Sequence, residues 1–224
     1  MSGARRAVIV PLALAAGATI WAGIVAGPEL AIYLAAPLLA CFYVPFVTLG
    51  PLPIRRAIAC AIGIATVLLA FDLRADITIG EWFRSVVVIA SWVIALAGVA
   101  NLLASLRITP TIAATFTSII ALAWMTWPVW LSHAMTQTLV NWLVPAHPLF
   151  AINGVLEHLG AWDHSPIAYR YLTILNQDIP FELPKSILPA TTVHLMLGVP
   201  LLLPQLRKKT GGPVEPPAIE SLST

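Results

Sequence analysis

Six long apolar stretches limit what this chain can fold into more than any other feature of the sequence. Crossing about 30 Å of hydrocarbon takes roughly 20 residues of α-helix, and these stretches approach that length. The composition agrees, since 59% of the residues are apolar and only 10% are charged, which is too apolar for a water-soluble domain. The ten-residue alternation of a barrel strand is missing. The sequence therefore predicts an all-α, polytopic membrane helix bundle of six spans, at residues 7–26, 30–49, 57–71, 79–106, 110–131 and 186–203.

These spans divide the chain into four parts. Spans one to five occupy residues 1–131, an extracytoplasmic interfacial helical segment is expected at 132–185, the sixth span at 186–206, and a disordered cytoplasmic tail at 207–224. The first span has an alternative interpretation as a cleaved signal peptide, because Arg5 and Arg6 precede an apolar run. Its full spanning length favours a retained helix.

The basic residues are distributed unequally between the two ends of the predicted bundle. The chain has 12 Lys and Arg residues, and cytoplasmic segments of bacterial membrane proteins collect such residues. With the amino terminus inside, the cytoplasmic end holds Arg5, Arg6, Arg55, Arg56, Arg107, Arg207, Lys208 and Lys209. We therefore expect a multi-pass protein of the cell inner membrane with both termini in the cytoplasm and segment 132–185 outside. The basic charge then reports topology and gives no evidence for nucleic-acid binding.

Short patterns support individual spans. Thr78 and Glu81 have the spacing of a capping box at the start of the fourth span. In the first span, small residues recur every fourth position, which lets another helix approach closely; they are Ala15, Thr19, Gly23 and Gly27. The two cysteines, Cys41 and Cys60, lie in apolar stretches without Cys-x-x-Cys spacing, so we expect them to be packing residues.

The fifth span contains the candidate path residues. A small, mildly polar face, formed by Thr111, Ala114, Thr115, Ser118 and Ala121, is expected to line the bundle interior or a translocation route, or simply to pack. Near the outer end, Trp124, Trp127 and Trp130 favour an aromatic belt at headgroup depth over a ligand-binding stack. Pro128 is tolerated there if a neighbouring group satisfies the carbonyl that it frees.

Ionisable residues are almost absent from the interiors of the spans. His194, in the sixth, is the single ionisable side chain well inside a span. Pumps normally carry buried carboxylates or paired charges along their path. We therefore expect His194 to be hydrogen-bonded to a neighbouring helix, with a relay or ligand role as the alternative.

Segment 132–185 contains most of the unusual chemistry. Pro148 and Gly160 are placed to begin and end one short helix, and Ser165 and Pro166 to begin a second. Oxygen and nitrogen donors for a zinc or copper ion are present, with His147, His158, Asp163 and His164 as the candidates. No pair of histidines has the spacing that puts both on one helix face, so solvated helix ends are the simpler interpretation.

Three runs of the sequence resemble the second half of type-two ATP-binding-cassette exporter permeases, namely Ala95–Arg107, Ala123–Ser132 and His147–Asn153. The similarity extends over residues 85–203. It implies six spans, an outer helical segment before the last span, and pairs of permeases served by separate ATPase subunits. The chain departs from this pattern before its first span and at residues 50–56, where the cytoplasmic helices of that family have too little room.

Three functions follow as hypotheses. The first is a permease-like subunit of an exporter for an apolar or lipid-linked substrate. It is not itself an enzyme, needs no cofactor, pairs with itself or a relative in the lipid bilayer, and works with a separate nucleotide-binding ATPase. Its path or gate would comprise Thr111, Thr115, Ser118, Trp124, Trp127 and Pro128, with Phe150 and Asn153 in an outer lid. The second is a non-catalytic structural or assembly subunit of a larger complex. The third is an extracytoplasmic metal-dependent enzyme.

Overall fold

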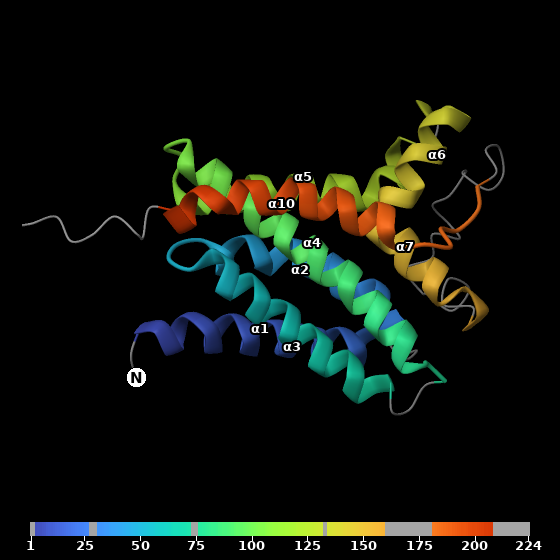
Figure 1. Ribbon diagram of the computed structural model, residues 1–224, viewed down its shortest axis with the longest axis horizontal. Helices are drawn as coiled ribbons and strands as arrows, with labels where there is room; N and C mark the ends of the chain where they lie inside the picture. The colour runs from blue at the N-terminus through green and yellow to red at the C-terminus, as the bar shows by residue number, and fades with distance from the viewer. Residues whose placement is uncertain (1–2, 27–30, 73–75, 132–133, 160–180, 208–224) are drawn as a thin grey trace, which may run out of the picture.

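The long helices of the protein lie side by side and form one bundle (Figure 1). The computed structural model describes residues 3–26, 31–72, 76–131, 134–159 and 181–207, which are helical and contain no strand. The long helices are α1 (Gly3–Ala26), α2 (Ala31–Thr48), α3 (Pro53–Asp72), α4 (Ile79–Ser105), α5 (Pro110–Trp130) and α10 (Leu188–Arg207). Helices α1 to α5 are long and apolar enough to cross a membrane. The chain is therefore a multi-pass helical membrane protein.

The sixth predicted span corresponds to α10. The apolar part of α10 within the described residues, Leu188–Leu203, is shorter than the other five. Helix α3, in contrast, is longer than the third predicted span. We expected it to begin at Ala57, but α3 begins at Pro53 and takes in Arg55 and Arg56, because helix can continue beyond the hydrocarbon once its charged side chains reach water.

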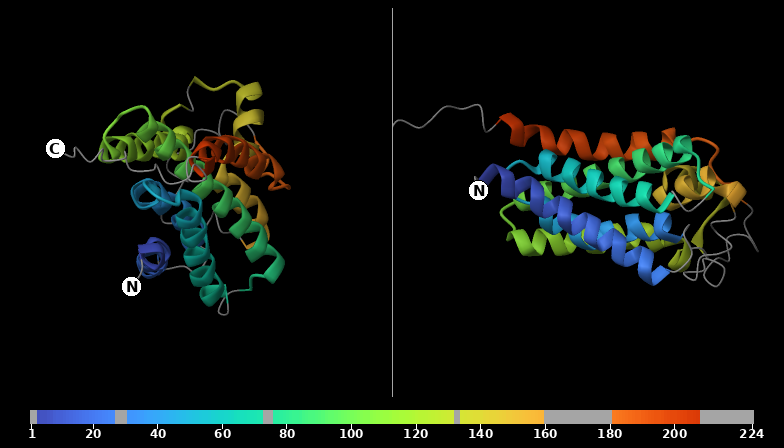
Figure 2. Two further views of the ribbon diagram at one scale, coloured as in Figure 1. Left: turned by 60° about the vertical axis from the view of Figure 1, so that its left-hand side comes forward. Right: turned by 90° about the horizontal axis from the view of Figure 1, so that it is seen from below.

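Helix α4 is the centre of the bundle. It packs against α10, α3, α2, α5 and α7, whereas α1 packs on α3 and α2 at the edge. The view in Figure 2 shows α5 and α10 on different sides of α4. The buried residues of α4 include Val88, Trp92, Val93 and Leu96. This arrangement leaves α5 and α10 joined mainly through α4.

The predicted capping box at the start of α4 is confirmed. The backbone N–H of Thr78 donates to Glu81 Oε2 at 2.8 Å, and the backbone N–H of Glu81 donates to Thr78 Oγ1 at 3.3 Å. These bonds satisfy amides that the first turn of a helix leaves without partners. They fix the N-terminal end of α4, the helix on which the other elements pack.

The predicted small stripe of α1 is also an interface. Ala15 and Thr19 are buried, and a Cβ atom on Gly63 of α3 would lie 2.7 Å from the carbonyl oxygen of Leu12. A Cβ atom on Gly23 would lie 2.6 Å from Cζ of Phe71 in α3. Gly27 is outside the described residues. Small side chains thus bring α1 and α3 into backbone contact, as the spacing predicted.

One end of the bundle holds Arg55, Arg56 and Arg107. The start of α1, the α2–α3 turn, the α4–α5 turn and the end of α10 lie together, opposite α6 and α7 (Figure 1). At this end Arg56 Nη1 donates to the carbonyl oxygens of Val47 at 3.2 Å and Leu49 at 2.5 Å. These carbonyls are at the C-terminus of α2, where a cation is favourable.

The opposite end carries the segment that was expected outside the membrane, named the outer segment for that expectation; it consists of α6 (Gln137–Ala146), α7 (Pro148–Val155) and the short 3-10 helix η2 (Glu157–Leu159). The expected helix beginning at Pro148 is present. It ends at Val155, not at Gly160. Helix α6 was not predicted, although Thr136 is its N-cap and accepts from the backbone N–H of Leu139. The second expected helix, beginning at Ser165, lies outside the described residues.

Candidate functional site

An apolar groove opens between α5 and α10, with α4 as its floor. It encloses about 290 Å³, and only apolar atoms are accessible along its walls. The residues that line it are Trp92, Ala95, Leu96, Val99, Thr117, Ile120, Ala121, Trp124, Val193, His194 and Leu197. Three of these lie on its exposed rim, since Ile120, Val193 and Leu197 are about half exposed. The groove is therefore accessible from the side of the bundle.

The sequence of α4 produces the floor. Trp92, Ala95, Leu96 and Val99 follow the i, i+3, i+4, i+7 spacing that places residues on one helix face. Ala121 of α5 is also small, and together with Ala95 it leaves the volume that larger side chains would fill. Each of these residues is ordinary in an apolar helix, so the groove becomes visible only once the helices are placed.

Two glycines hold α10 against α4. A Cβ atom on Gly98 would lie 2.7 Å from the carbonyl oxygen of Gly198, and one on Gly198 would lie 2.6 Å from the carbonyl oxygen of Ile94. Backbones approach this closely only where side chains are absent. This contact fixes one wall of the groove, while α5 packs on α4 and α2 to form the other.

His194 lies at the floor of the groove and is 2% exposed. Its Nδ1 is 3.3 Å from Ser91 Oγ in α4, and Ser91 Oγ donates to the carbonyl oxygen of Val88 at 2.7 Å. Because a hydroxyl has a single proton, Ser91 accepts from His194 Nδ1–H. The expected hydrogen bond to a neighbouring helix is thereby confirmed. His194 Nε2 has no partner among the described residues.

A second buried histidine lies above the groove, at the junction of α6 and α7. His147 is 0% exposed, and its Nε2 is 3.1 Å from the carbonyl oxygen of Trp124. A carbonyl only accepts, so His147 donates. Trp124 is four residues before Pro128, which has no N–H to offer this carbonyl. His147 thus supplies the donor that Pro128 removes from α5, as the proline required.

Aromatic rings surround His147. The centroid of its ring is 5.6 Å from that of Trp124, 6.2 Å from Trp127 and 5.0 Å from Phe150. Burial in this cluster lowers the pKa of His147 to about 3, against the smaller opposing effect of its hydrogen bond to Trp124. The histidine is neutral at physiological pH and functions here as a hydrogen-bond donor.

The predicted aromatic belt is wrong for two of its three tryptophans. Trp127 is 2% exposed, and Trp124 is partly buried against the groove and His147. The reason is the outer segment, which folds back over the end of α5 and buries the rings that would otherwise meet headgroups. The side chain of Trp130 lies outside the described residues.

The other candidate path residues differ in burial. Ser118, Pro128, Phe150 and Asn153 are buried, whereas Thr111 and Thr115 are exposed. The two threonines lie on the outer face of α5 because the residues that pack inward are Ala113, Ala114, Thr117, Ser118 and Ala121. The small face of five residues is therefore not continuous. Both polar atoms of the Asn153 amide lack a partner among the described residues.

The structure does not bring the described metal candidates together. His147 is enclosed by aromatic rings, while the side chain of His158 is 54% exposed and its Nε2 lies 3.5 Å from Glu81 Oε1. Within the described ranges, no three His, Cys, Asp or Glu residues are grouped as a metal site. Asp163 and His164 lie outside those ranges.

Comparison with known proteins gives no relative. No protein-family model, curated protein or solved structure matches the chain. The function is therefore argued from the groove and its surroundings.

Proposed function

We propose that the chain is a permease-like membrane subunit that takes an apolar or lipid-linked molecule from the bilayer into the groove between α5 and α10. The observation that carries this proposal is the groove itself, an apolar space of about 290 Å³ with a lipid-facing rim. Small-molecule sites are commonly mostly apolar clefts of roughly 300 to 1,000 Å³. The groove lies close to the lower end of that range and suits one chain or ring system.

The surroundings of the groove favour a molecule that arrives laterally. Its rim residues Ile120, Val193 and Leu197 are apolar and about half exposed, so a lipid tail can enter without crossing a polar surface. Inside a bilayer, an apolar molecule gains little from leaving lipid, and selectivity depends on close packing. Two tryptophans in the lining, Trp92 of the floor and Trp124 of the α5 wall, supply large rigid surfaces for such contacts.

The proposed topology follows from the two ends of the bundle. Basic residues gather where Arg55, Arg56 and Arg107 lie, and by the positive-inside rule this end faces the cytoplasm. In this proposal α10 is the sixth span, both termini are cytoplasmic, and α6 and α7 are outside the cell inner membrane. The buried α7, with Phe150 and Asn153, then closes the outer end of the bundle as a lid.

Energy for export would come from a separate ATPase subunit, as the resemblance to type-two exporters implies. Affinity purification in mild detergent tests this part, with a nucleotide-binding partner as the expected result. Recovery of a complex without any ATPase would contradict the permease and favour the structural subunit.

The groove is tested by tryptophan fluorescence. Bromine quenches tryptophan at short range, so a 1-bromoalkane added to purified protein should quench Trp92 and Trp124. The blocked variant is Ala121→Leu, in which a larger side chain fills part of the groove. A tryptophan at this position would add its own fluorescence to the readout. Equal quenching of wild type and Ala121→Leu would show that the alkane does not enter the groove.

A further inference from the structure

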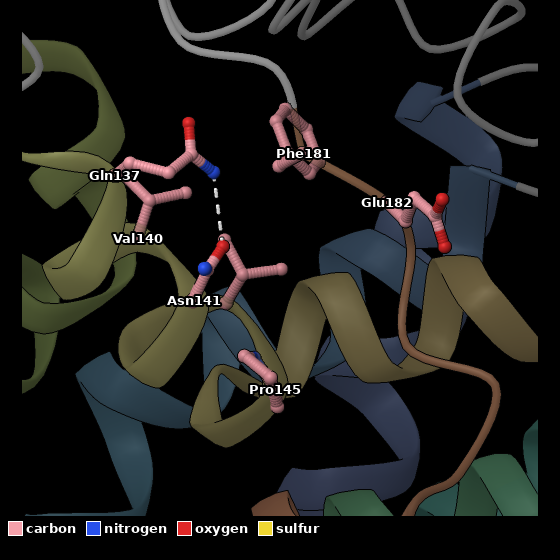
Figure 3. A pocket seen from close by; sticks show the side chains of 7 residues that line it. Gln137, Val140, Asn141, Pro145, Phe181 and Glu182 are labelled. Atoms are coloured by element: carbon pink, nitrogen blue, oxygen red, sulfur yellow. Dashed lines mark hydrogen bonds between the residues drawn. The ribbon is translucent and has the colours of Figure 1, made fainter.

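A second pocket lies at the outer end of the bundle, away from the apolar groove (Figure 3). It has a volume of about 450 Å³ and lies between α6 and the chain that leads toward α10. The lining residues are Gln137, Val140, Asn141, Val144, Pro145, Phe181 and Glu182. Unlike the groove, this pocket has accessible polar atoms.

One wall is a pair of side-chain amides. Gln137 Nε2 donates to Asn141 Oδ1 at 3.0 Å, one helical turn along α6. This bond uses Asn141 Oδ1 as the acceptor and leaves both protons of Asn141 Nδ2 available. Asn141 Nδ2 has no partner among the described residues. Figure 3 shows both amides on the same side of the pocket. The wall therefore offers the amide donors of Asn141 in a fixed arrangement.

The facing wall is an aromatic ring. The ring of Phe181 meets that of Phe150 edge to face, with centroids 5.2 Å apart and an interplanar angle of 77°. Phe150 is 0% exposed and also contacts His147. Phe181 is thus attached to the buried aromatic cluster, and its position does not depend on a ligand. Buried Val140 and Val144 of α6 complete the apolar surface below it.

The charge of the pocket excludes one class of ligand. Its described lining contains no Lys or Arg, and Glu182 carries a negative charge, so phosphate and carboxylate groups would be repelled. The carboxylate of Glu182 is turned away from the amide pair in Figure 3, which leaves a neutral centre between the amides and the ring. A cation would therefore have no direct carboxylate ligand at this centre.

We propose that this pocket binds a neutral group rich in hydroxyls, such as a sugar ring or a polyol. The amide of Asn141, held in place by Gln137, donates hydrogen bonds to hydroxyls, and the C–H face of the ligand packs on Phe181. The same chemistry is presented by a free sugar and by the headgroup of a glycolipid. This site is separate from the groove, and it stands whether or not the groove admits an apolar molecule.

The test uses full-length protein in nanodiscs made with phosphocholine lipid and no glycolipid. Saturation-transfer NMR measures binding of methyl β-glucoside, octyl β-glucoside and methyl phosphate. We expect saturation of the glucosides and none of methyl phosphate. Comparable affinity for the two glucosides would identify a free-sugar site, and tighter binding of octyl β-glucoside that Asn141→Leu weakens would identify a headgroup site. Absence of glucoside binding, or equal binding of methyl phosphate, would overturn the proposal.

The variants connect binding to the pocket. Asn141→Leu removes hydrogen bonds at an exposed position and should weaken glucoside binding about fivefold or more, the factor that corresponds to roughly 1 kcal/mol. Thr138→Leu is the matched control, because Thr138 is exposed on α6 but does not line the pocket. If both variants bind as the wild type does, the ligand lies elsewhere and the assignment is wrong.

Discussion

His147 Nε2 donates a hydrogen bond to the carbonyl oxygen of Trp124 at 3.1 Å. This is the carbonyl that loses its helical partner because Pro128 has no N–H. The bond joins α5 to the junction of α6 and α7, and it places His147 among the rings of Trp124, Trp127 and Phe150. The proline in a membrane span and the histidine in the outer segment thus form one structural unit.

This relationship predicts non-additive mutations. His147→Leu leaves the Trp124 carbonyl buried without a donor and should lower the free energy of unfolding by about 1 to 3 kcal/mol. In Pro128→Ala the helix can supply its own N–H, so adding His147→Leu to that variant should cost much less. Thermal unfolding of the four proteins in one detergent measures the coupling. Equal effects of His147→Leu in both backgrounds would refute the proposed role of the proline.

The same histidine predicts a pH dependence of stability. Burial lowers the pKa of His147 to about 3, whereas an unfolded histidine titrates near 6.5. The unfolded state therefore binds more protons between these values, and the contribution of His147 to stability is full above about pH 6.5 and declines as the pH falls toward 3. The free energy of unfolding changes through His147 by at most about 1.4 kcal/mol per pH unit.

Denaturation at several pH values compares wild type with His147→Leu, in which this part of the slope should disappear. Thr138→Leu is the control, because Thr138 is exposed and has no ionisable side chain, so this variant should leave the slope nearly unchanged. A slope that persists in His147→Leu would assign the titration to another group.

The contact between α4 and α10 predicts a position-specific cost. Gly98→Ala places a Cβ atom 2.7 Å from the carbonyl oxygen of Gly198, so the helices must separate, at a cost of about 1 to 3 kcal/mol. Gly17→Ala in α1 is the matched control, since a Cβ there meets nothing within 4 Å. That variant should be neutral or more stable by up to about 1 kcal/mol, because alanine favours helix. Thermal unfolding measures the stability of both variants. The same change of stability in Gly98→Ala and Gly17→Ala would contradict the close approach of α4 and α10.

Replacing Asn153 should change stability and function in opposite directions. It is 1% exposed, and neither polar atom of its side chain has a partner among the described residues. Replacement by leucine removes a buried polar group and should raise stability by roughly 1 kcal/mol. In the proposed lid the same variant should reduce export activity. A loss of stability above about 1 kcal/mol would show instead that the amide has a hydrogen-bond partner in the folded protein.

The sequence predicts the helices well because each signal is local. The apolar lengths locate α1, α2, α4 and α5 within a few residues, and the Thr78–Glu81 box gives the start of α4. The start of α3 was misplaced because Arg55 and Arg56 were assigned to a loop. Charge marks the edge of the hydrocarbon, not the end of the helix.

The site was less predictable because it depends on contacts between distant segments. Trp124 and Trp127 have the spacing of a headgroup belt, and only the outer segment folding over α5 buries them. Thr111 and Thr115 are small hydroxyl residues, as Ser118 is, but they are exposed whereas Ser118 is buried. The groove residues Trp92, Ala95 and Val99 carry no motif, since the space exists through the separation of α5 from α10.

The central claim is that the groove holds an apolar molecule taken from the membrane. Mass spectrometry of protein extracted gently from its own membrane tests it most directly, with Ala121→Trp as a variant whose groove is filled by the indole. The account predicts that wild type retains one apolar molecule that Ala121→Trp lacks. The same set of bound molecules in both proteins would contradict it.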